Sequence, residues 1–214
     1  MRLRRYLRLA FAILFVCAAY SALAQVVPAA TQSRSTFAAG VGLSDYNSDW
    51  EQGRLLGGTL WLGYTPARMP WFLHGVGLDI EARDLNYGRS SASPDLREDT
   101  AMGGPIYSWH HYRKFQPYAK FLFGYGNRDA EYVNTKIVPN IFERYNDNRN
   151  ILAWGGGVDY QVSRSIWVRG DYEYQRWPDM VFKNAIPVGI PIAPIHPNGF
   201  TIGALYHFGS PHLH

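Results

Sequence analysis

The chain has 214 residues, with 21 Lys and Arg against 17 Asp and Glu and a formal net charge of +4. Four arginines lie in the first eight residues and no acidic residue lies in the first 24, so the remaining chain carries 17 basic and 17 acidic groups. Because the rest of the chain is neutral by this count, its charge gives no support for a nucleic-acid partner, and we expect none. Cys17 is the only cysteine, which excludes an intrachain disulfide framework and a cysteine-ligated metal site.

Residues 1–24 have the three parts of a secretory signal peptide. A basic start to Arg8 is followed by an apolar run, LAFAILFVCAA, and then by the small-residue sequence SALA. We predict cleavage between Ala24 and Gln25, with Ala22 and Ala24 as the small residues of the site. The apolar run is shorter than the roughly 20 residues of a membrane-spanning helix, so a retained N-terminal anchor is the less favoured alternative.

The rest of the chain alternates apolar and polar residues nearly throughout, with interruptions rich in Gly, Pro, Asn and Asp. A two-residue period is typical of strands and not of helices. A short N-terminal segment at 25–34 and a tail at 209–214 flank the strands. We predict eight strands, at 35–45, 54–65, 71–84, 101–111, 116–126, 150–162, 165–177 and 199–208.

The predicted connections alternate between short and long. Turns of a few residues join the second strand to the third, the fourth to the fifth and the sixth to the seventh. Longer polar or Pro-rich loops include those at 85–100, 127–149 and 178–198. All short turns then leave from one end of the sheet, which predicts an up-and-down membrane barrel with periplasmic turns and long external loops.

Six of the predicted strands have an apolar face and a polar face, the exceptions being 54–65 and 101–111. Leu78 and Ile80 alternate with Asp79 and Glu81, for example, and the polar faces also carry many glycines. A buried charge costs several kcal/mol unless it is paired, so polar-face charges of both signs suit a network inside a barrel. The predicted interior network consists of Asp79, Glu81, Arg83, Lys120, Asp159, Arg169, Asp171 and Glu173.

Alternation alone fits two architectures. A secreted calyx would turn the apolar faces inward, whereas a membrane barrel turns them toward lipid. Small residues on the polar faces and aromatic residues near the ends of the apolar faces favour the membrane barrel. Eight strands leave an interior just wide enough for side chains, so we expect a plugged interior, with a narrow ion-conducting channel as an alternative.

The mature chain resembles the OmpA-like eight-stranded outer-membrane β-barrel domain family. The resemblance is carried by the hairpin 104–126, the strand pair 154–174 and the end 199–208. It implies a monomer in outer-membrane lipid, placed there by the barrel assembly machinery. The last strand would carry the assembly signal, although six residues follow Phe208 where the family ends. The signal residues implied are Phe200, Ile202, Tyr206 and Phe208.

Some barrels of this size are enzymes, and a hydrolase would need Ser or Thr near His and an acid. Ser108 with His110 or His111 is the nearest pairing, but it falls at the predicted periplasmic end. We therefore predict no catalytic residues and no enzyme. A lipid A- or phospholipid-modifying barrel is the alternative, and it would need Ser, His and an acid together near the outer rim.

No metal or cofactor site is predicted. His110 and His111 are adjacent and point to opposite faces of a strand, and His212 and His214 lie in the tail. The glycines at 155–157 precede no helix, so they do not form a phosphate loop. The expected function is a structural or surface-interaction role, with an external ligand at the loops 85–100, 127–149 and 178–198.

Overall fold

The computed structural model describes residues 36–49, 53–66, 69–70, 73–89, 96–109, 114–133, 142–178, 180–181, 191–192 and 194–208. The predicted signal peptide, its cleavage site at Ala22, Ala24 and Gln25, and the tail at 209–214 lie outside these residues. His110 and His111 also lie outside them. Within the described ranges, no helix is long and apolar enough to cross a membrane.

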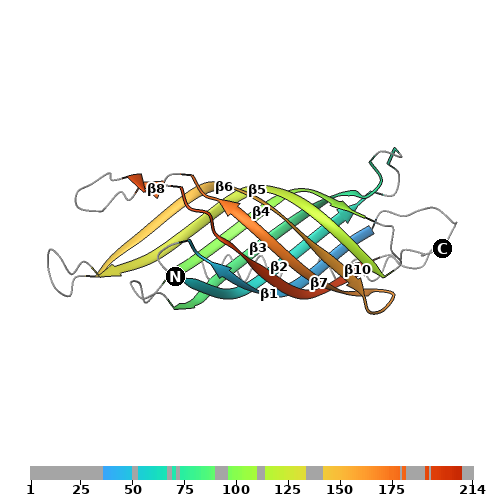
Figure 1. The fold of residues 1–214 in the computed structure, drawn as a ribbon, viewed down its shortest axis with the longest axis horizontal. Coiled ribbons are helices and arrows are strands. Elements are labelled where there is room, and N and C mark those ends of the chain that lie inside the picture. Colours follow the sequence, from blue (N-terminus) through green and yellow to red (C-terminus); the bar gives the residue numbers. More distant parts are fainter. Residues whose placement is uncertain are drawn as a thin grey trace, which may run out of the picture. The chain divides into compact units, whose positions relative to one another are not determined.

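The described part of the chain contains ten strands, and eight of them are long (Figure 1). The long strands are β1 Thr36–Asn47, β2 Arg54–Thr65, β3 Val76–Arg89, β4 Leu96–Ser108, β5 Phe115–Val133, β6 Phe142–Gln161, β7 Ile166–Arg176 and β10 Asn198–Phe208. The short strands β8 Met180–Val181 and β9 Pro191–Ile192 pair with each other within the connection from β7 to β10.

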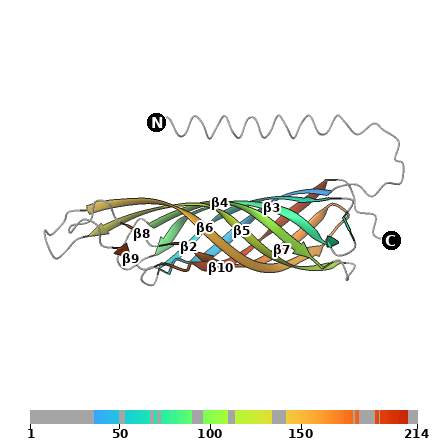
Figure 2. The ribbon, with the colours of Figure 1, turned by 90° about the horizontal axis from the view of Figure 1, so that it is seen from above.

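The eight long strands form a closed antiparallel barrel in the order β1-β10-β7-β6-β5-β4-β3-β2. Sequence neighbours pair around the wall, and β1 closes the barrel on β10 from Phe37↔Phe208 to Asn47↔Asn198. Figures 1 and 2 show the strands inclined to the long axis and wrapped around it. The predicted eight-stranded up-and-down transmembrane fold is confirmed. Closure pairs the strand edges that an open sheet would leave exposed, as lipid requires.

The connections define two ends. We call the end with the β2–β3, β4–β5 and β6–β7 connections the turn end, and the opposite end the loop end. Thr36 and Phe208, the first and last residues described, both lie at the turn end because β1 starts there and β10 finishes there.

Two predicted loops are largely strand, which corrects their boundaries. In the range 85–100, β3 runs to Arg89 and β4 begins at Leu96. In the range 127–149, β5 and β6 stay paired from Asn127↔Asn148 to Val133↔Phe142. The polarity that indicated loops marks where the strands leave the apolar layer, not where hydrogen bonding stops.

The third predicted loop, 178–198, is also partly ordered by backbone pairing. β8 and β9 lie within it, and Trp177 forms an isolated bridge with Ile195. The Trp177 backbone N–H donates to the Ile195 carbonyl at 2.9 Å, and the Gln175 N–H donates to the Pro197 carbonyl at 2.7 Å. These bonds tie the described ends of the connection to each other directly above β7 and β10.

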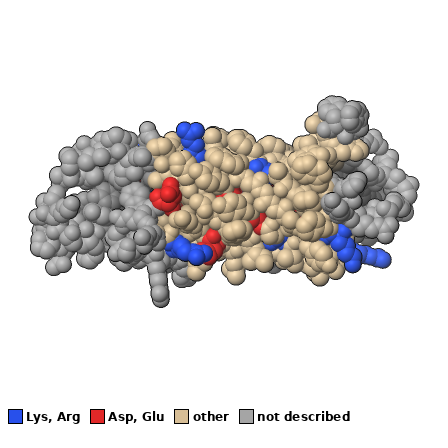
Figure 3. Space-filling view, in the orientation of Figure 1, with Lys and Arg blue, Asp and Glu red and all other residues tan. Residues whose placement is uncertain are grey.

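Side-chain direction decides between a membrane barrel and a soluble calyx. Leu78, Ile80 and Phe123 are each 56% exposed, and Phe121 is 49% exposed. In a calyx these side chains would be buried, so the apolar faces point outward. Figure 3 shows one side of this surface as mostly uncharged, with the larger exposed charged groups toward the ends. An outward apolar band that encircles a closed barrel is the surface that hydrocarbon requires.

Candidate functional site

All eight residues of the predicted interior network are buried and face the lumen. Successive side chains of a strand point to opposite faces of the sheet. These eight residues therefore point inward, because the residues next to them in the sequence point toward lipid. The structure joins them into two groups. The lysine hub comprises Lys120 with the residues Glu81, Asp171, Glu173 and Arg83. The arginine clamp comprises Arg169 with Asp159 and Asp79.

Lys120 is the centre of the hub. Its ammonium lies against Glu81, 2.6 Å from Asp171 Oδ2 and 2.8 Å from Glu173 Oε2. These three carboxylates are mutually close enough to hold a metal ion, with oxygens within 4.8 Å of one another. The ammonium already takes the place that a cation would need, and so the trio serves as a lysine site and not as a metal site.

Arg83 completes the hub toward the loop end. Its Nη1 donates to Glu173 Oε1 at 2.9 Å and its Nη2 to Glu81 Oε2 at 3.0 Å. The guanidinium also lies 4.3 Å from the centre of the Tyr46 ring. Charge-assisted bonds of this kind are roughly twice as strong as neutral ones. The Arg83 bonds join β3 to β7, and the Lys120 bonds add β5. These three strands are not neighbours in the wall.

Aromatic side chains that sequence reasoning did not assign to the site complete the hydrogen bonding. Trp61 Nε1 donates to Glu81 at 3.0 Å, and Tyr118 Oη donates to Asp171 at 2.7 Å. Both rings also flank Arg169, at 5.5 and 4.6 Å from its guanidinium carbon. Trp61 and Tyr118 have the inward parity of their strands, and this parity was the available signal.

An apolar cap lies in the lumen between the hub and the loop end. The cap is a buried cluster of residues from β4, β5, β6 and the β7–β10 connection, namely Met102, Leu122, Ile151, Ala153, Trp177 and Ile195. Trp177 Nε1 donates to Gln175 at 2.8 Å, and Gln175 Nε2 donates to Glu173 at 2.9 Å. The cap is therefore joined by hydrogen bonds to the charged hub below it.

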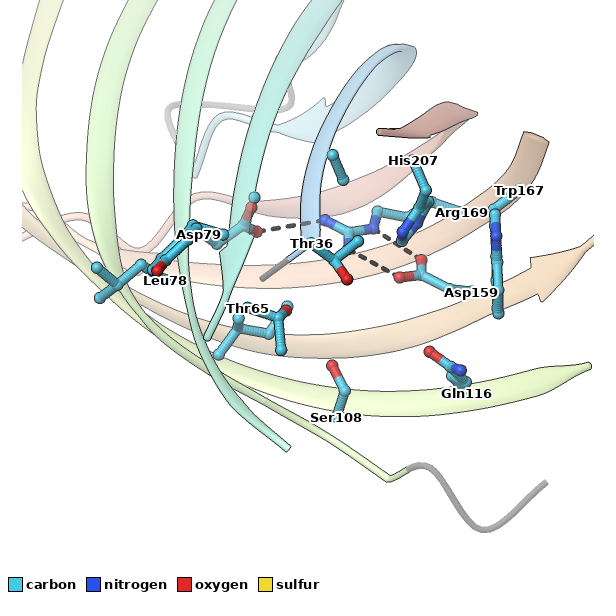
Figure 4. Close-up of a pocket in the computed structure, with 14 residues that line it drawn as sticks. Thr36, Thr65, Leu78, Asp79, Ser108, Gln116, Asp159, Trp167, Arg169 and His207 are labelled. Atoms are coloured by element: carbon cyan, nitrogen blue, oxygen red, sulfur yellow. Dashed lines mark hydrogen bonds and ion pairs between the residues drawn. The ribbon is translucent and has the colours of Figure 1, made fainter. Parts of the chain in front are cut away.

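The arginine clamp lies between the hub and the turn end. Arg169 donates from Nε and Nη2 to the two oxygens of Asp159, both at 2.8 Å, and from Nη1 to Asp79 Oδ2 at 3.3 Å. Below it, a cavity opens at the turn end (Figure 4). Ser108 and His207 both line this cavity, yet no hydrogen bond joins them, so they do not form a nucleophile–base pair.

The four residues implied as an assembly signal occupy one side of β10. Phe200, Ile202, Tyr206 and Phe208 are all exposed on the lipid face. Tyr206 and Phe208 contact each other at 4.8 Å between ring centroids, at the turn end. Their recognition by assembly machinery stays a prediction.

A family model described as outer membrane protein beta-barrel domain matches residues 10–208. No curated protein matches the chain. Three solved structures are similar in fold. One is Neisserial surface protein A (TM-score 0.55, 11% identity, covering 81% of this chain and 97% of that one). A second is a major outer membrane protein from Thermus thermophilus (TM-score 0.59, 12% identity, 81% and 99%). The third is Ail, the attachment invasion locus protein of Yersinia pestis, in complex with the heparin analogue sucrose octasulfate (TM-score 0.50, 16% identity, 83% and 100%).

Proposed function

The chain belongs to the outer membrane protein beta-barrel domain family, and from this premise we propose that it is a sealed, non-enzymatic barrel whose loop-end hairpins make contacts outside the cell. The observation that carries the proposal is the filled lumen. The hub crosses the barrel from β3 to β5 and β7, and the apolar cap lies above it. A solute would have to break charge-assisted bonds and then displace buried indole and aliphatic side chains.

The β5–β6 hairpin supports the second half of the proposal. Pairing of β6 with β7 ends at Leu152↔Arg176, whereas its pairing with β5 continues to Val133↔Phe142. The hairpin thus extends beyond the β7 wall at the loop end. On its outward face, Asn127 and Asn146 exchange hydrogen bonds at 3.4–3.5 Å. Paired strands hold a projecting surface in a defined shape, which lowers the entropy cost of binding a partner.

The chemistry of the loop-end surface favours a polar partner of mixed charge. The exposed Arg97 is paired with Asp84 and Asp99, each at 3.1 Å, and the exposed Arg54 is paired with Asp45. Ail is described in complex with a sulfated heparin analogue. In this chain the arginines of these pairs already have carboxylate partners, so a protein surface is the better candidate than a polysulfated ligand.

Two measurements on one variant test the proposal. In the variant, residues 128–147 are replaced by an Asn-Gly turn, which favours a tight hairpin. Purified wild-type protein should produce no steady conductance in planar bilayers. Cells that display wild-type protein should be retained on protein-coated surfaces more strongly than cells that display the variant, with both proteins folded as judged by heat-modifiable gel mobility. Steady conductance by the wild-type protein would refute the sealed barrel. Equal retention of cells that display the wild type and cells that display the variant would refute the contact role of the hairpin.

The remaining expectations about export and partners belong to the same proposal. Cleavage after Ala24 would give a mature protein that begins at Gln25, which sequencing of the N-terminus of outer-membrane material tests. The mature barrel would be a monomer in outer-membrane lipid, delivered by the barrel assembly machinery. Uncleaved protein in that fraction would contradict the cleavage step and leave the barrel assignment unaffected.

A further inference from the structure

Among the described residues, the lumen opens into a cavity at the turn end, and the hub lies between this cavity and the loop end. The cavity has a volume of about 120 Å³ and is lined by residues from all eight barrel strands. Hydroxyl and amide groups of Thr36, Thr65, Ser108 and Gln116 line its sides, and Arg169 lies at its inner end (Figure 4). Each of these four side chains offers an oxygen that can accept a hydrogen bond or coordinate a cation.

Asp79 is incompletely satisfied at this cavity. Its side chain is 1% exposed, and its only hydrogen bond within the described residues is the one that Oδ2 accepts from Arg169 at 3.3 Å. Its other oxygen, Oδ1, would lie 3.9 Å from a Cβ built on Gly63, a residue that also lines the cavity. The small residue at position 63 thus leaves open space beside an anionic oxygen that has no donor among the residues described.

The interior charges do not balance. The hub and the clamp together contain five carboxylates, those of Asp79, Glu81, Asp159, Asp171 and Glu173. They contain three cations, those of Lys120, Arg83 and Arg169. Lys120 and Arg83 are occupied within the hub, and Arg169 is shared between two carboxylates. Uncompensated charge that is buried away from water costs several kcal/mol, so binding of a proton or a cation would lower the free energy of the folded barrel.

We propose that the turn-end cavity binds a small monovalent cation, such as Na⁺ or K⁺, between Asp79 Oδ1 and the hydroxyl groups of the cavity wall. The cavity lies beside the excess charge and has both open space and neutral oxygen ligands. Carboxylate, hydroxyl and water oxygens are the ligands that hard cations prefer. The cation enters from the turn end, because the hub and the apolar cap lie between the cavity and the loop end. In the orientation of the proposed function, the turn end faces the periplasm.

The test compares Na⁺, K⁺ and N-methyl-D-glucamine chlorides at constant ionic strength, with folded protein in detergent micelles. A ligand that binds only the folded state raises the folded-to-unfolded ratio by up to about tenfold for each tenfold rise in its free concentration. We expect this rise at fixed urea with Na⁺ or K⁺ and not with the bulky organic cation, which the cavity cannot hold. Equal ratios in all three salts would overturn the proposal.

Variants separate a cation from a proton. Asp79→Asn should abolish the difference among salts, and Thr65→Val should weaken it without a change in charge. Asp84→Asn, in an exposed ion pair with Arg97 on the outer surface, is the matched control and should retain it. If protons compensate the charge, lower pH stabilises the protein equally in all three salts, and the proposal is wrong. A salt difference that persists in both Asp79→Asn and Thr65→Val also overturns it.

Discussion

The indole of Trp177 occupies the space that a side chain at Gly126 would need. A Cβ built on Gly126 would stand 2.7 Å from Cζ2 and 2.8 Å from Cζ3 of that ring. Trp177 begins the β7–β10 connection, and Gly126 lies in β5 on the inward parity. The start of the connection is thus anchored inside the barrel wall, because the Trp177 ring packs against Gly126 in the space that a larger side chain there would fill. Small lumenal residues serve here to admit large neighbours.

Gly126→Val should expel Trp177 from the cap. Overpacking of a filled interior typically costs about 1–3 kcal/mol, and the displaced indole should become accessible to aqueous quenchers of tryptophan fluorescence. Gly170→Val is the matched control, because a Cβ built on Gly170 has no atom within 4 Å. The predicted role of Gly126 is wrong if both variants unfold at the same urea concentration.

Lys120→Met should destabilise the barrel far more than its loss of volume suggests. Removal of one partner from a buried ionic group typically costs about 3–5 kcal/mol, and here three carboxylates lose their shared ammonium. Urea unfolding, followed by heat-modifiable gel mobility, measures the loss.

A second substitution distinguishes electrostatics from packing. Glu81→Gln added to Lys120→Met removes one of the orphaned charges and should recover part of the lost stability. Glu98→Gln, at a carboxylate that does not contact Lys120, should recover less in the same background. Equal recovery from both would show that the hub does not act as a local unit.

The lumenal positions of the charged residues could be predicted, but their pairing could not. Strand periodicity assigns Lys120 and Asp171 to the polar faces of their strands, and this assignment does not depend on where each strand begins. Their contact at 2.6 Å joins β5 to β7, which are separated by β6 in the wall. Such a contact depends on the stagger between strands and on the barrel diameter, and neither is encoded in a two-residue period.

Strand length was underestimated for a related reason. Asn127 and Asn148 lie opposite each other in the β5–β6 ladder, where sequence polarity suggested a loop. The change from apolar to polar side chains along a strand marks where its outward face passes from lipid to water. The backbone pairing of the two strands continues beyond that point. Trp177 ends a predicted strand on the inward parity of Glu173 and Gln175, and it is fully buried. It was missed because the interior was predicted from charged residues, although parity already pointed this indole inward.

A charged side chain introduced on the outward face should destabilise the barrel, and the loss should be larger nearer the middle of the bilayer. Phe123→Arg would place a guanidinium in the apolar band, where Arg costs about 2–4 kcal/mol at the bilayer midplane. Asn127→Arg, on the same strand and parity but among polar groups, should cost less than about 1 kcal/mol. Equilibrium unfolding from phospholipid vesicles measures both. A soluble surface would tolerate the two substitutions equally.

Phe208→Ser tests whether the end of β10 acts in assembly or only in the final barrel. Phe208 pairs with Phe37 across the closing seam and is exposed on the lipid face. If assembly machinery reads this residue, the variant should accumulate unfolded in cells, yet refold from urea into detergent with nearly wild-type stability. Phe115→Ser, at an exposed aromatic residue of β5 at the same end, is the control. It should resemble Phe208→Ser in detergent and the wild type in cells. Equal defects of the two variants in cells would leave Phe208 with no role beyond that of an interfacial aromatic residue.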